Sequence, residues 1–343
     1  MTLPLPPLQS QRPQPLFASR LAPDAWLRLV GSSQPMLGGL GWGCSGPGLA
    51  PLHVPVLSEA GPWVDAWYGQ QADVRSGRSG AVQWQADSDW AFGQLELPNA
   101  DADLAQSTRS AYHDVFAALK DCGRPQVLRL WNYLPRINAD GGGLERYRQF
   151  NIGRQQAFLD AGEDAFEGSP AACAIGLDDG PLALRFLAGR GSPLPLDNPR
   201  QVPAWRYPTA YGPRCPTFSR AALSQAGSGL LALWVSGTAS IVGHATVHDD
   251  DVQAQVRETV VNLRAVVDAA RQRSSADWRL ENLHATVYVR HASDYTLVQQ
   301  ALEDALGAGS PLVRQAVAVR ADICRAALRV EIEGHMLAAG VLQ

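Results

Sequence analysis

The sequence predicts an α+β protein built from two α+β domains, and three observations support this prediction. The chain has 343 residues, more than one small domain needs and enough to bury a large core. Short apolar and aromatic runs are interspersed with a few stretches of helical periodicity. Glycine, acidic residues and a Ser-Pro pair gather around residues 161–171, where a seam between domains is expected. The predicted division is an N-terminal arm over residues 1–20, a first domain over 21–165 and a second domain over 166–343.

The first domain is expected to begin with strands and to contain two helices. Aromatic runs predict strands near residues 63–68, 81–84 and 90–95. Apolar residues at helical spacing predict an amphipathic helix over residues 101–122. A strand at 127–131 then leads through a glycine-rich turn into a second helix, which carries Arg148 and Arg154.

The second domain opens with two apolar runs, residues 172–177 and 182–188, which predict a hairpin around an Asp-Asp-Gly turn. Residues 189–220 form a long loop rich in proline and arginine, which we expect to form a wall of the functional site. The remaining elements are expected in the order strand, helix, strand, helix, strand and strand, over residues 230–236, 250–273, 283–290, 295–306, 316–320 and 328–333. Helices that cross over one face of such a sheet make an α+β sandwich.

The composition argues against several classes of partner and compartment. The 29 basic and 33 acidic residues give a net charge of −4, which offers no basic field for nucleic acid. No run of about 18 apolar residues is present, so no membrane span is expected. The five cysteines are scattered without a CxxC pair, which argues against a disulfide framework or a zinc site and favours a reducing cytoplasm.

One acidic cluster resembles a metal site. His244 and His248 are followed by three aspartates at residues 249–251. These aspartates directly precede a predicted helix, where carboxylates cap free amide groups, and no third ligand motif accompanies them. A formal GxGxxG at residues 41–46 lacks the strand and helix of a dinucleotide site. We therefore favour helix capping over metal binding at residues 249–251 and expect no dinucleotide site at residues 41–46.

The stretch ADICRAALRVEIE, residues 321–333, holds the candidate acid. Val330 and Ile332 share one face of the predicted strand, while Glu331 and Glu333 share the other. A glutamate in a concave, partly dry site can stay protonated near neutral pH and act as a general acid. The alternative is a half-exposed edge strand with two solvated glutamates, and the strand pattern alone leaves both interpretations open.

Small and basic residues form a second group of candidates. The stretch SGTAS at residues 236–240 places Gly237 and Thr238 at a strand end, where a ligand can approach the backbone or where the chain simply turns tightly. Arginines recur in the predicted loops and helices at positions Arg148, Arg154, Arg206, Arg220 and Arg314. Guanidinium groups bind carboxylates through paired hydrogen bonds, which suits a small anionic ligand, although each arginine alone fits a solvated position equally well.

Longer motifs resemble known families. Residues 230–336 resemble a Rid/YjgF-like domain in their element order, in the Val-Tyr-Val strand at 287–289, in the turn at 311–314 and in the VEIE stretch. The chain as a whole is more closely similar to the chorismatase family, the chorismate-cleaving hydrolases and 3-hydroxybenzoate synthases. The stretches that carry this resemblance are WNYLPRIN (131–138), GLERYRQFNIGR (143–154), YGPRCPTFSRA (211–221), VSGTASIVGH (235–244) and CRAALRVEIEG (324–334).

The resemblance implies a fold, a substrate and a reaction. The C-terminal domain would be Rid-like and chorismate-mutase-like, preceded by the second α+β domain, and the enzyme would act on chorismate without a metal or organic cofactor. Glu331 would be the acid that protonates the enolpyruvyl methylene, after which pyruvate leaves. Gly237 and Cys324 match the branch that forms 3-hydroxybenzoate, in some members with 4-hydroxybenzoate as a second product. In the hydrolytic branch the first position is alanine and the second is not cysteine, and water adds to give a dihydroxycyclohexadiene carboxylate.

The two carboxylates of chorismate require binding groups. Arg314 matches the turn in which Rid-like proteins carry a carboxylate-binding arginine. Arg148, Arg154, Tyr207 and Arg220 lie in stretches that match the chorismatase family, and carboxylate binding by these residues is an inference from their chemistry.

Rival functions and the oligomeric state stay open at this point. Arg314 and Glu331 also suit a Rid-like imine deaminase, although Rid proteins lack the N-terminal half of this chain. A chorismate hydrolase and a non-catalytic module that binds small acids are further alternatives. Rid-like domains usually trimerise, whereas the additional N-terminal half could cover the equivalent surface, so both a monomer and a homotrimer are compatible with the sequence.

Overall fold

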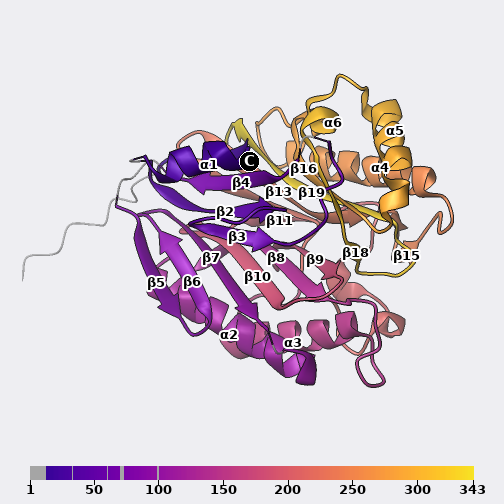
Figure 1. The fold of residues 1–343 in the computed structure, drawn as a ribbon, viewed down its shortest axis with the longest axis horizontal. Helices are drawn as coiled ribbons and strands as arrows, with labels where there is room; N and C mark the ends of the chain where they lie inside the picture. The colour runs from indigo at the N-terminus through magenta and orange to yellow at the C-terminus, as the bar shows by residue number, and fades with distance from the viewer. Residues whose placement is uncertain (1–12, 33, 60, 70–72, 99) are drawn as a thin grey trace, which may run out of the picture.

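The fold consists of three main β-sheets flanked by helices (Figure 1). The computed structural model describes residues 13–32, 34–59, 61–69, 73–98 and 100–343. The α-helices of these residues are α1 (Pro23–Val30), α2 (Leu104–Cys122), α3 (Arg146–Ala161), α4 (Val252–Arg271), α5 (Tyr295–Leu306) and α6 (Pro311–Gln315).

The spatial order of the strands defines each sheet. The four-stranded sheet contains β1 (Phe17–Leu21), β4 (Trp63–Tyr68), β2 (Met36–Trp42) and β3 (Leu49–Leu52). The seven-stranded sheet contains β18 (Asp322–Ile323), β9 (Ala171–Leu177), β8 (Gln126–Pro135), β10 (Leu182–Gly189), β7 (Trp90–Leu97), β6 (Val82–Ala86) and β5 (Arg75–Ser79). The six-stranded sheet contains β11 (Leu194–Leu196), β12 (Ala221–Gly227), β13 (Leu230–Ala239), β19 (Val330–Ala339), β16 (His284–Val289) and β17 (Val317–Arg320). A small ribbon pairs β14 (Ile241–Val242) with β15 (Ala245–Thr246).

The sheets and helices stack in layers around three large apolar clusters. Helices α2 and α3 pack on the outer face of the seven-stranded sheet, and α4 and α5 pack on the outer face of the six-stranded sheet (Figure 1). The inner faces of the sheets meet in a central cluster that contains Trp42, Trp67, Trp131 and Trp234. This arrangement confirms the predicted α+β class, with helices segregated to the outer faces of the sheets.

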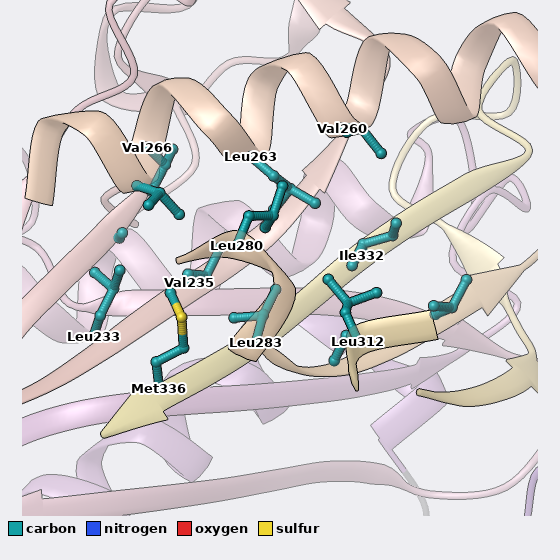
Figure 2. Close-up of a cluster of buried hydrophobic side chains, with 14 of the residues drawn as sticks. Leu233, Val235, Val260, Leu263, Val266, Leu280, Leu283, Leu312, Ile332 and Met336 are labelled. Atoms are coloured by element: carbon teal, nitrogen blue, oxygen red, sulfur yellow. The ribbon is translucent and has the colours of Figure 1, made fainter. Parts of the chain in front are cut away.

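Helix α4 shows why the C-terminal half folds as the sequence predicts. Its valine and leucine residues recur at helical spacing, and Val260, Leu263 and Val266 lie over the sheet that carries Leu233 and Met336 (Figure 2). Each fully buried side chain of this size contributes about 1.5–3 kcal/mol by leaving water. The apolar stripe therefore fixes which face of α4 packs on β13 and β19.

Capping residues set the beginnings of the two long helices. The carboxylate of Asp251 accepts a hydrogen bond from the amide of Ala254 at 2.9 Å, and Asp103 does the same for Gln106 at 2.9 Å. These bonds satisfy amide groups that have no partner within the first helical turn. The capping role predicted for the acidic run before α4 is thus confirmed for Asp251.

The predicted hairpin at residues 172–188 is wrong. Strands β9 and β10 are not neighbours, because β8 lies between them and pairs in parallel with β9 and antiparallel with β10. The Asp-Asp-Gly segment still turns the chain, but a turn signal is local and does not specify which strands pair.

The seven-stranded sheet continues past the predicted domain boundary at residue 165. Strands β9 and β10 lie beyond residue 165, yet they belong to the seven-stranded sheet together with β5–β8. The first residues of the six-stranded sheet are those of β11. The reason is that β9, which follows the glycine-rich segment near residue 165, pairs in parallel with β8 and so extends the seven-stranded sheet.

The described part of the predicted N-terminal arm is ordered as a strand. Strand β1 pairs antiparallel with β4, from Phe17 opposite Tyr68 to Leu21 opposite Val64. Residues 1–12 of the predicted arm lie outside the described residues. Across the described ranges of the chain, no helix is both long and apolar enough to cross a membrane.

Candidate active site

The site is built around a bulge in β13. Val235 lies opposite Gly334 of β19 and Thr238 lies opposite Ile332, so two residues of β13, one of which is Gly237, face a single residue of β19. Such an insertion bends a strand and redirects its side chains. The bulge therefore opens the inner face of the six-stranded sheet beside Gly237.

Hydrogen bonds of Ser236 hold the bulge in place. Its hydroxyl donates to the carbonyl oxygen of Ser219 at 2.6 Å and accepts from the amide of Ala172 at 3.0 Å. Ala172 belongs to β9, so a single buried side chain connects the bulge to the seven-stranded sheet.

A cavity of about 290 Å³ lies next to the bulge. Its walls come from the start of α3, from the long loop before β12 and from the segment before β19. The residues that line it are Glu145, Tyr147, Arg148, Tyr207, Tyr211, Pro216, Phe218, Arg220, Gly237, Ala239, Ile241, Cys324, Arg325, Ala326, Ala327 and Glu331. An adjoining cavity of about 30 Å³ shares five of these residues and also contacts Arg154 and Cys173.

Glu331 is buried deep in this cavity. Its side chain belongs to a central strand, β19, and the residue is 4% exposed, so the alternative of a half-exposed edge strand is wrong. Its carboxyl oxygen Oε2 lies 3.9 Å from Sγ of Cys324. Burial, followed by the negative charge of Glu333, raises the pKa of Glu331 to about 8. Glu331 is therefore a protonated carboxylic acid at neutral pH.

Cys324 presents a thiol, not a thiolate, to this acid. Burial and the neighbouring charge of Glu331 raise the pKa of Cys324 to about 12. A thiol is a weak donor and a poor nucleophile. Cys324 is thus suited to shape the cavity and contact the acid, not to attack a substrate.

Because Gly237 has no side chain, the carboxyl group of Glu331 can occupy the space beside it. A Cβ atom at position 237 would lie 1.9 Å from Oε1 of Glu331 and 2.7 Å from its Cδ. Real Cβ contacts are never this short. The observed position of the acid therefore requires glycine at residue 237.

Arg154 is a buried cation without a carboxylate partner. Its Nη2 donates to Oδ1 of Asn151 at 3.2 Å, while Nε and Nη1 have no hydrogen-bond partner among the described residues. The residue is 0% exposed, and its guanidinium lies 4.9 Å from the ring centre of Phe150. A buried guanidinium that lacks a counter-ion is costly to maintain, which indicates a binding group for an anion.

Arg220 and Tyr207 form a second polar group in the wall. Nη2 of Arg220 donates to the hydroxyl of Tyr207 at 2.7 Å and to the carbonyl oxygen of Val202 at 2.9 Å. Its Nε has no partner among the described residues. Arg148 lines the same cavity and its Nε lies 3.3 Å from Oε2 of Glu145.

Two predicted site residues lie elsewhere. Thr238 lines neither cavity, and its hydroxyl donates to the carbonyl oxygen of Ser236 at 2.9 Å. Successive strand residues point to opposite faces, so Thr238 turns away from the cavity that Gly237 faces.

Arg314 is not part of this cavity either. It lies on α6 and lines a separate cavity of about 230 Å³. That cavity contains Val287 and Val298, which pack on the helix-covered face of the six-stranded sheet. Glu331 projects from the opposite face of this sheet, so the structure does not bring Arg314 and Glu331 to one ligand.

Sequence reasoning missed Arg325 and the two tyrosines Tyr147 and Tyr211, which also line the cavity. Nη1 of Arg325 donates to the carbonyl oxygen of His244 at 2.7 Å, and its guanidinium lies 4.2 Å from the ring centre of Tyr211. Its Nη2 is buried without a partner among the described residues. All three missed residues fall within the motif stretches, which was the signal that could have identified them.

The two histidines before α4, His244 and His248, contact other side chains. Nδ1 of His244 lies 3.2 Å from the hydroxyl of Tyr211, and Nε2 of His248 lies 3.7 Å from Oε2 of Glu258. Within the described part of the chain, no three His, Cys, Asp or Glu side chains are grouped so that they could hold a metal ion.

A cavity that combines a protonated carboxylic acid with arginine N–H groups that lack a partner among the described residues is typical of an enzyme that acts on a small anionic molecule. Residues 65–188 match the family described as "Chorismatase FkbO/Hyg5-like, N-terminal". The chain is 35% identical over 291 residues to a 3-hydroxybenzoate synthase of Streptomyces hygroscopicus, covering 82% of this chain and 84% of the relative. It is 36% identical over 279 residues to a chorismatase of Streptomyces rapamycinicus, covering 79% and 81%.

A solved structure shows the same architecture. The crystal structure of a chorismatase superposes with a TM-score of 0.83 at 30% sequence identity, covering 95% of this chain and 100% of the other. The chain therefore belongs to the chorismatase family of enzymes. This confirms the family resemblance and the α+β architecture predicted from the sequence motifs.

Proposed function

We propose that this enzyme cleaves chorismate to 3-hydroxybenzoate and pyruvate and that Glu331 is the acid that starts the reaction. The observation that carries the proposal is the buried carboxyl group of Glu331, whose pKa of about 8 keeps it protonated at neutral pH inside a cavity with arginine in its walls. General acids work best when their pKa lies near the working pH. The names of the two relatives support chorismate as the substrate.

The cations of the site suit a molecule with two carboxylates. Arg154 lines the small cavity, and Arg220, whose Nη2 donates to the Tyr207 hydroxyl, lines the larger one. Nε of each has no partner among the described residues, and we call these two residues the inner pair. Arg148 and Arg325 lie in the wall of the larger cavity. We assign one carboxylate of chorismate to the inner pair and the other to the outer pair, since paired guanidinium hydrogen bonds hold a planar carboxylate in a fixed orientation.

The reaction begins with a proton transfer from Glu331 to the methylene carbon of the enolpyruvyl group. The methylene becomes a methyl group, and the ether carbon becomes cationic. The ring hydroxyl oxygen then attacks the neighbouring ring carbon, the bond from that carbon to the ether oxygen breaks, and pyruvate leaves with that oxygen. The hydroxyl proton returns to the carboxylate of Glu331. The resulting arene oxide opens at the carbon that carried the hydroxyl group, its oxygen takes up a proton, and the ring loses a proton from the carbon that keeps the oxygen. The product is 3-hydroxybenzoate, with no net change in protons and no water consumed.

Gly237 and Cys324 favour this internal attack over the addition of water. Glycine allows the acid to reach its observed position, and Sγ of Cys324 fills the space next to Oε2 of Glu331. An internal rearrangement depends on a near-attack arrangement of atoms within the bound substrate. Residues that set the position of the acid and the ring are therefore expected to control the product.

Incubation with chorismate tests the proposal. We expect equimolar 3-hydroxybenzoate and pyruvate by chromatography and a coupled pyruvate assay, with any 4-hydroxybenzoate as a minor product. A dihydroxycyclohexadiene carboxylate as the main product would indicate the hydrolase instead. Ammonia release from an imino acid, without chorismate consumption, would indicate the deaminase. Calorimetric binding of chorismate without turnover would indicate a binding module.

A further inference from the structure

Strand β19 carries two buried carboxyl groups with opposite surroundings. Glu331 and Glu333 project from the same face of the strand and are 4% and 2% exposed. Glu333 forms an ion pair with Arg129 and accepts a hydrogen bond from the hydroxyl of Tyr288. Glu331 forms no ion pair with any described residue, and its nearest polar contact is the thiol of Cys324 at 3.9 Å.

We propose that Glu333 is a positioning residue that holds a fixed negative charge beside Glu331 and thereby keeps Glu331 protonated and able to donate its proton. This proposal rests on the role of Glu331 in the proposed function. Glu333 lines neither the 290 Å³ cavity nor the adjoining small cavity, so it has no contact with the space for the substrate. Its effect must therefore act through Glu331.

The ion pair explains why the two carboxyl groups differ. A guanidinium and a phenol both donate to Glu333, so its carboxyl group is held in an ion pair. Residues two apart on one side of a strand are separated by only about 7 Å along the backbone, which is short enough for strong repulsion between two buried charges. With Glu333 ionised, the second charge is excluded and the proton stays on Glu331. Pairs of acids with opposed surroundings are a common way to fix which one donates.

The other charged and titratable groups around Glu331 do not replace this effect. From the sheets, these groups are Arg129, Cys173, Arg220 and Arg290. From the helix and loops, they are Glu145, Tyr147, Arg148, Arg154, Tyr207, Tyr211, Cys324 and Arg325. The charges of Arg129, Arg220 and Arg290 lower the pKa of Glu331, whereas burial and Glu333 raise it. Glu145 also lines the cavity but pairs with Arg148, whose Nε lies 3.3 Å from its Oε2. Glu333 is the carboxylate whose charge opposes the arginines at Glu331.

Substitution of Glu333 separates an electrostatic role from a merely structural one. For the wild type, we expect the alkaline limb of kcat/KM near pH 8. Glu333→Gln should shift this limb to lower pH by about one unit or more, because the charge that repels ionised Glu331 is lost and Arg129 is left unpaired. Glu333→Asp keeps the charge and should restore the limb to within a few tenths of a unit. A uniform loss of rate with an unmoved limb would overturn the proposal.

Asp65→Asn is the matched control. Asp65 is a buried carboxylate, 6% exposed, that is paired with Arg20 at 2.7 Å but lies on β4 outside the cavity. Its substitution should lower stability in the same way as a change at Glu333 without moving the alkaline limb. A limb that moved equally in Asp65→Asn would show that any buried ion pair has this effect and would overturn the specific role of Glu333.

A direct titration keeps the two proposals distinguishable. Carbon-13 NMR of the labelled glutamate carboxyl groups, assigned with Glu331→Gln, should show Glu331 titrating near pH 8 in the wild type. If Glu331 is already ionised at pH 6, its role as the acid fails as well. If Glu331 titrates near pH 8 in both the wild type and Glu333→Gln, only the role of Glu333 fails. If Glu333→Gln does not fold, the wild-type titration still decides, because a Glu331 signal that titrates below about pH 6 would show that no repelling charge acts on it.

Discussion

Substitution of Gly237 tests how the bulge of β13 controls the fate of the substrate ring. An alanine Cβ at this position would lie 1.9 Å from Oε1 of Glu331, whereas ordinary van der Waals contact begins at 3.4 Å. The carboxyl group must therefore retreat by roughly 1.5 Å. A misplacement of about 1 Å at a reacting group can cost on the order of 10²-fold in rate. We expect formation of 3-hydroxybenzoate by Gly237→Ala to fall by about this factor.

The double variant Gly237→Ala with Cys324→Ala should change the product as well as the rate. Loss of the sulfur atom opens space beside the displaced acid, and water can then compete with the ring hydroxyl. Chromatography after incubation with chorismate should show a shift toward the dihydroxycyclohexadiene carboxylate. Gly191→Ala is the control, since a Cβ there meets nothing within 4 Å. An unchanged share of 3-hydroxybenzoate in the double variant would remove both residues from product control.

Further predictions concern the charges of the site. Above about pH 8, kcat/KM should fall tenfold per pH unit as Glu331 loses its proton, and a flat profile to pH 9.5 would contradict this. Because folding raises the pKa of Glu331 from 4.5 to about 8, the unfolded chain releases this proton first, and the free energy of unfolding should decline between these pH values. Glu331→Gln removes that decline. The free energy of unfolding in urea, variant minus wild type, should therefore be larger at pH 8 than at pH 5, by on the order of a few kcal/mol. An equal difference between variant and wild type at both pH values would contradict this prediction. Arg154→Met should raise KM by about 10²-fold without lowering the thermal midpoint, since it removes a buried charge that has no counter-ion; an unchanged KM would exclude Arg154 from binding. Arg314→Gln should leave kcat/KM within twofold, and a tenfold loss would show that its separate cavity matters for turnover.

Local patterns in the sequence were sufficient for the C-terminal elements. The helix predicted at residues 295–306 has the bounds of α5, and the stripe predicted for residues 250–273 is the buried face of α4. Strand partners were harder to predict because pairing is non-local. The turn at Asp178 and Asp179 suggested a hairpin, yet β8, some forty residues earlier in the chain, inserts between β9 and β10.

The site shows the same division between local and non-local information. Strand alternation correctly placed Glu331 and Glu333 on one face, but burial of that face by a second sheet could not be read from the strand itself. The sequence predicted that Gly237 and Thr238 both belong to the site. In the structure, the bulge of β13 and the alternation of side chains along the strand direct only Gly237 toward the cavity. The acid role of Glu331 stays a prediction, which the pKa of about 8 and the family membership support.

The arginines show why residue type alone is a weak guide. Arg314 has the right chemistry for a carboxylate but lies on the other side of the six-stranded sheet. Arg325 was not among the predicted residues, and only the tertiary structure places it between Tyr207 and Tyr211, at 5.1 and 4.2 Å from the ring centres. Cation–π contacts of this kind depend on loops far apart in the sequence.

Pyruvate release by Glu331→Gln tests the proposed acid most directly. Glutamine keeps the size of the side chain but has no carboxyl proton to donate to the methylene carbon. We predict that the variant still binds chorismate in calorimetry, while its turnover falls by about 10²–10⁴-fold relative to the wild type. Pyruvate release at a near-normal rate by this variant would contradict the role of Glu331 and the mechanism built on it.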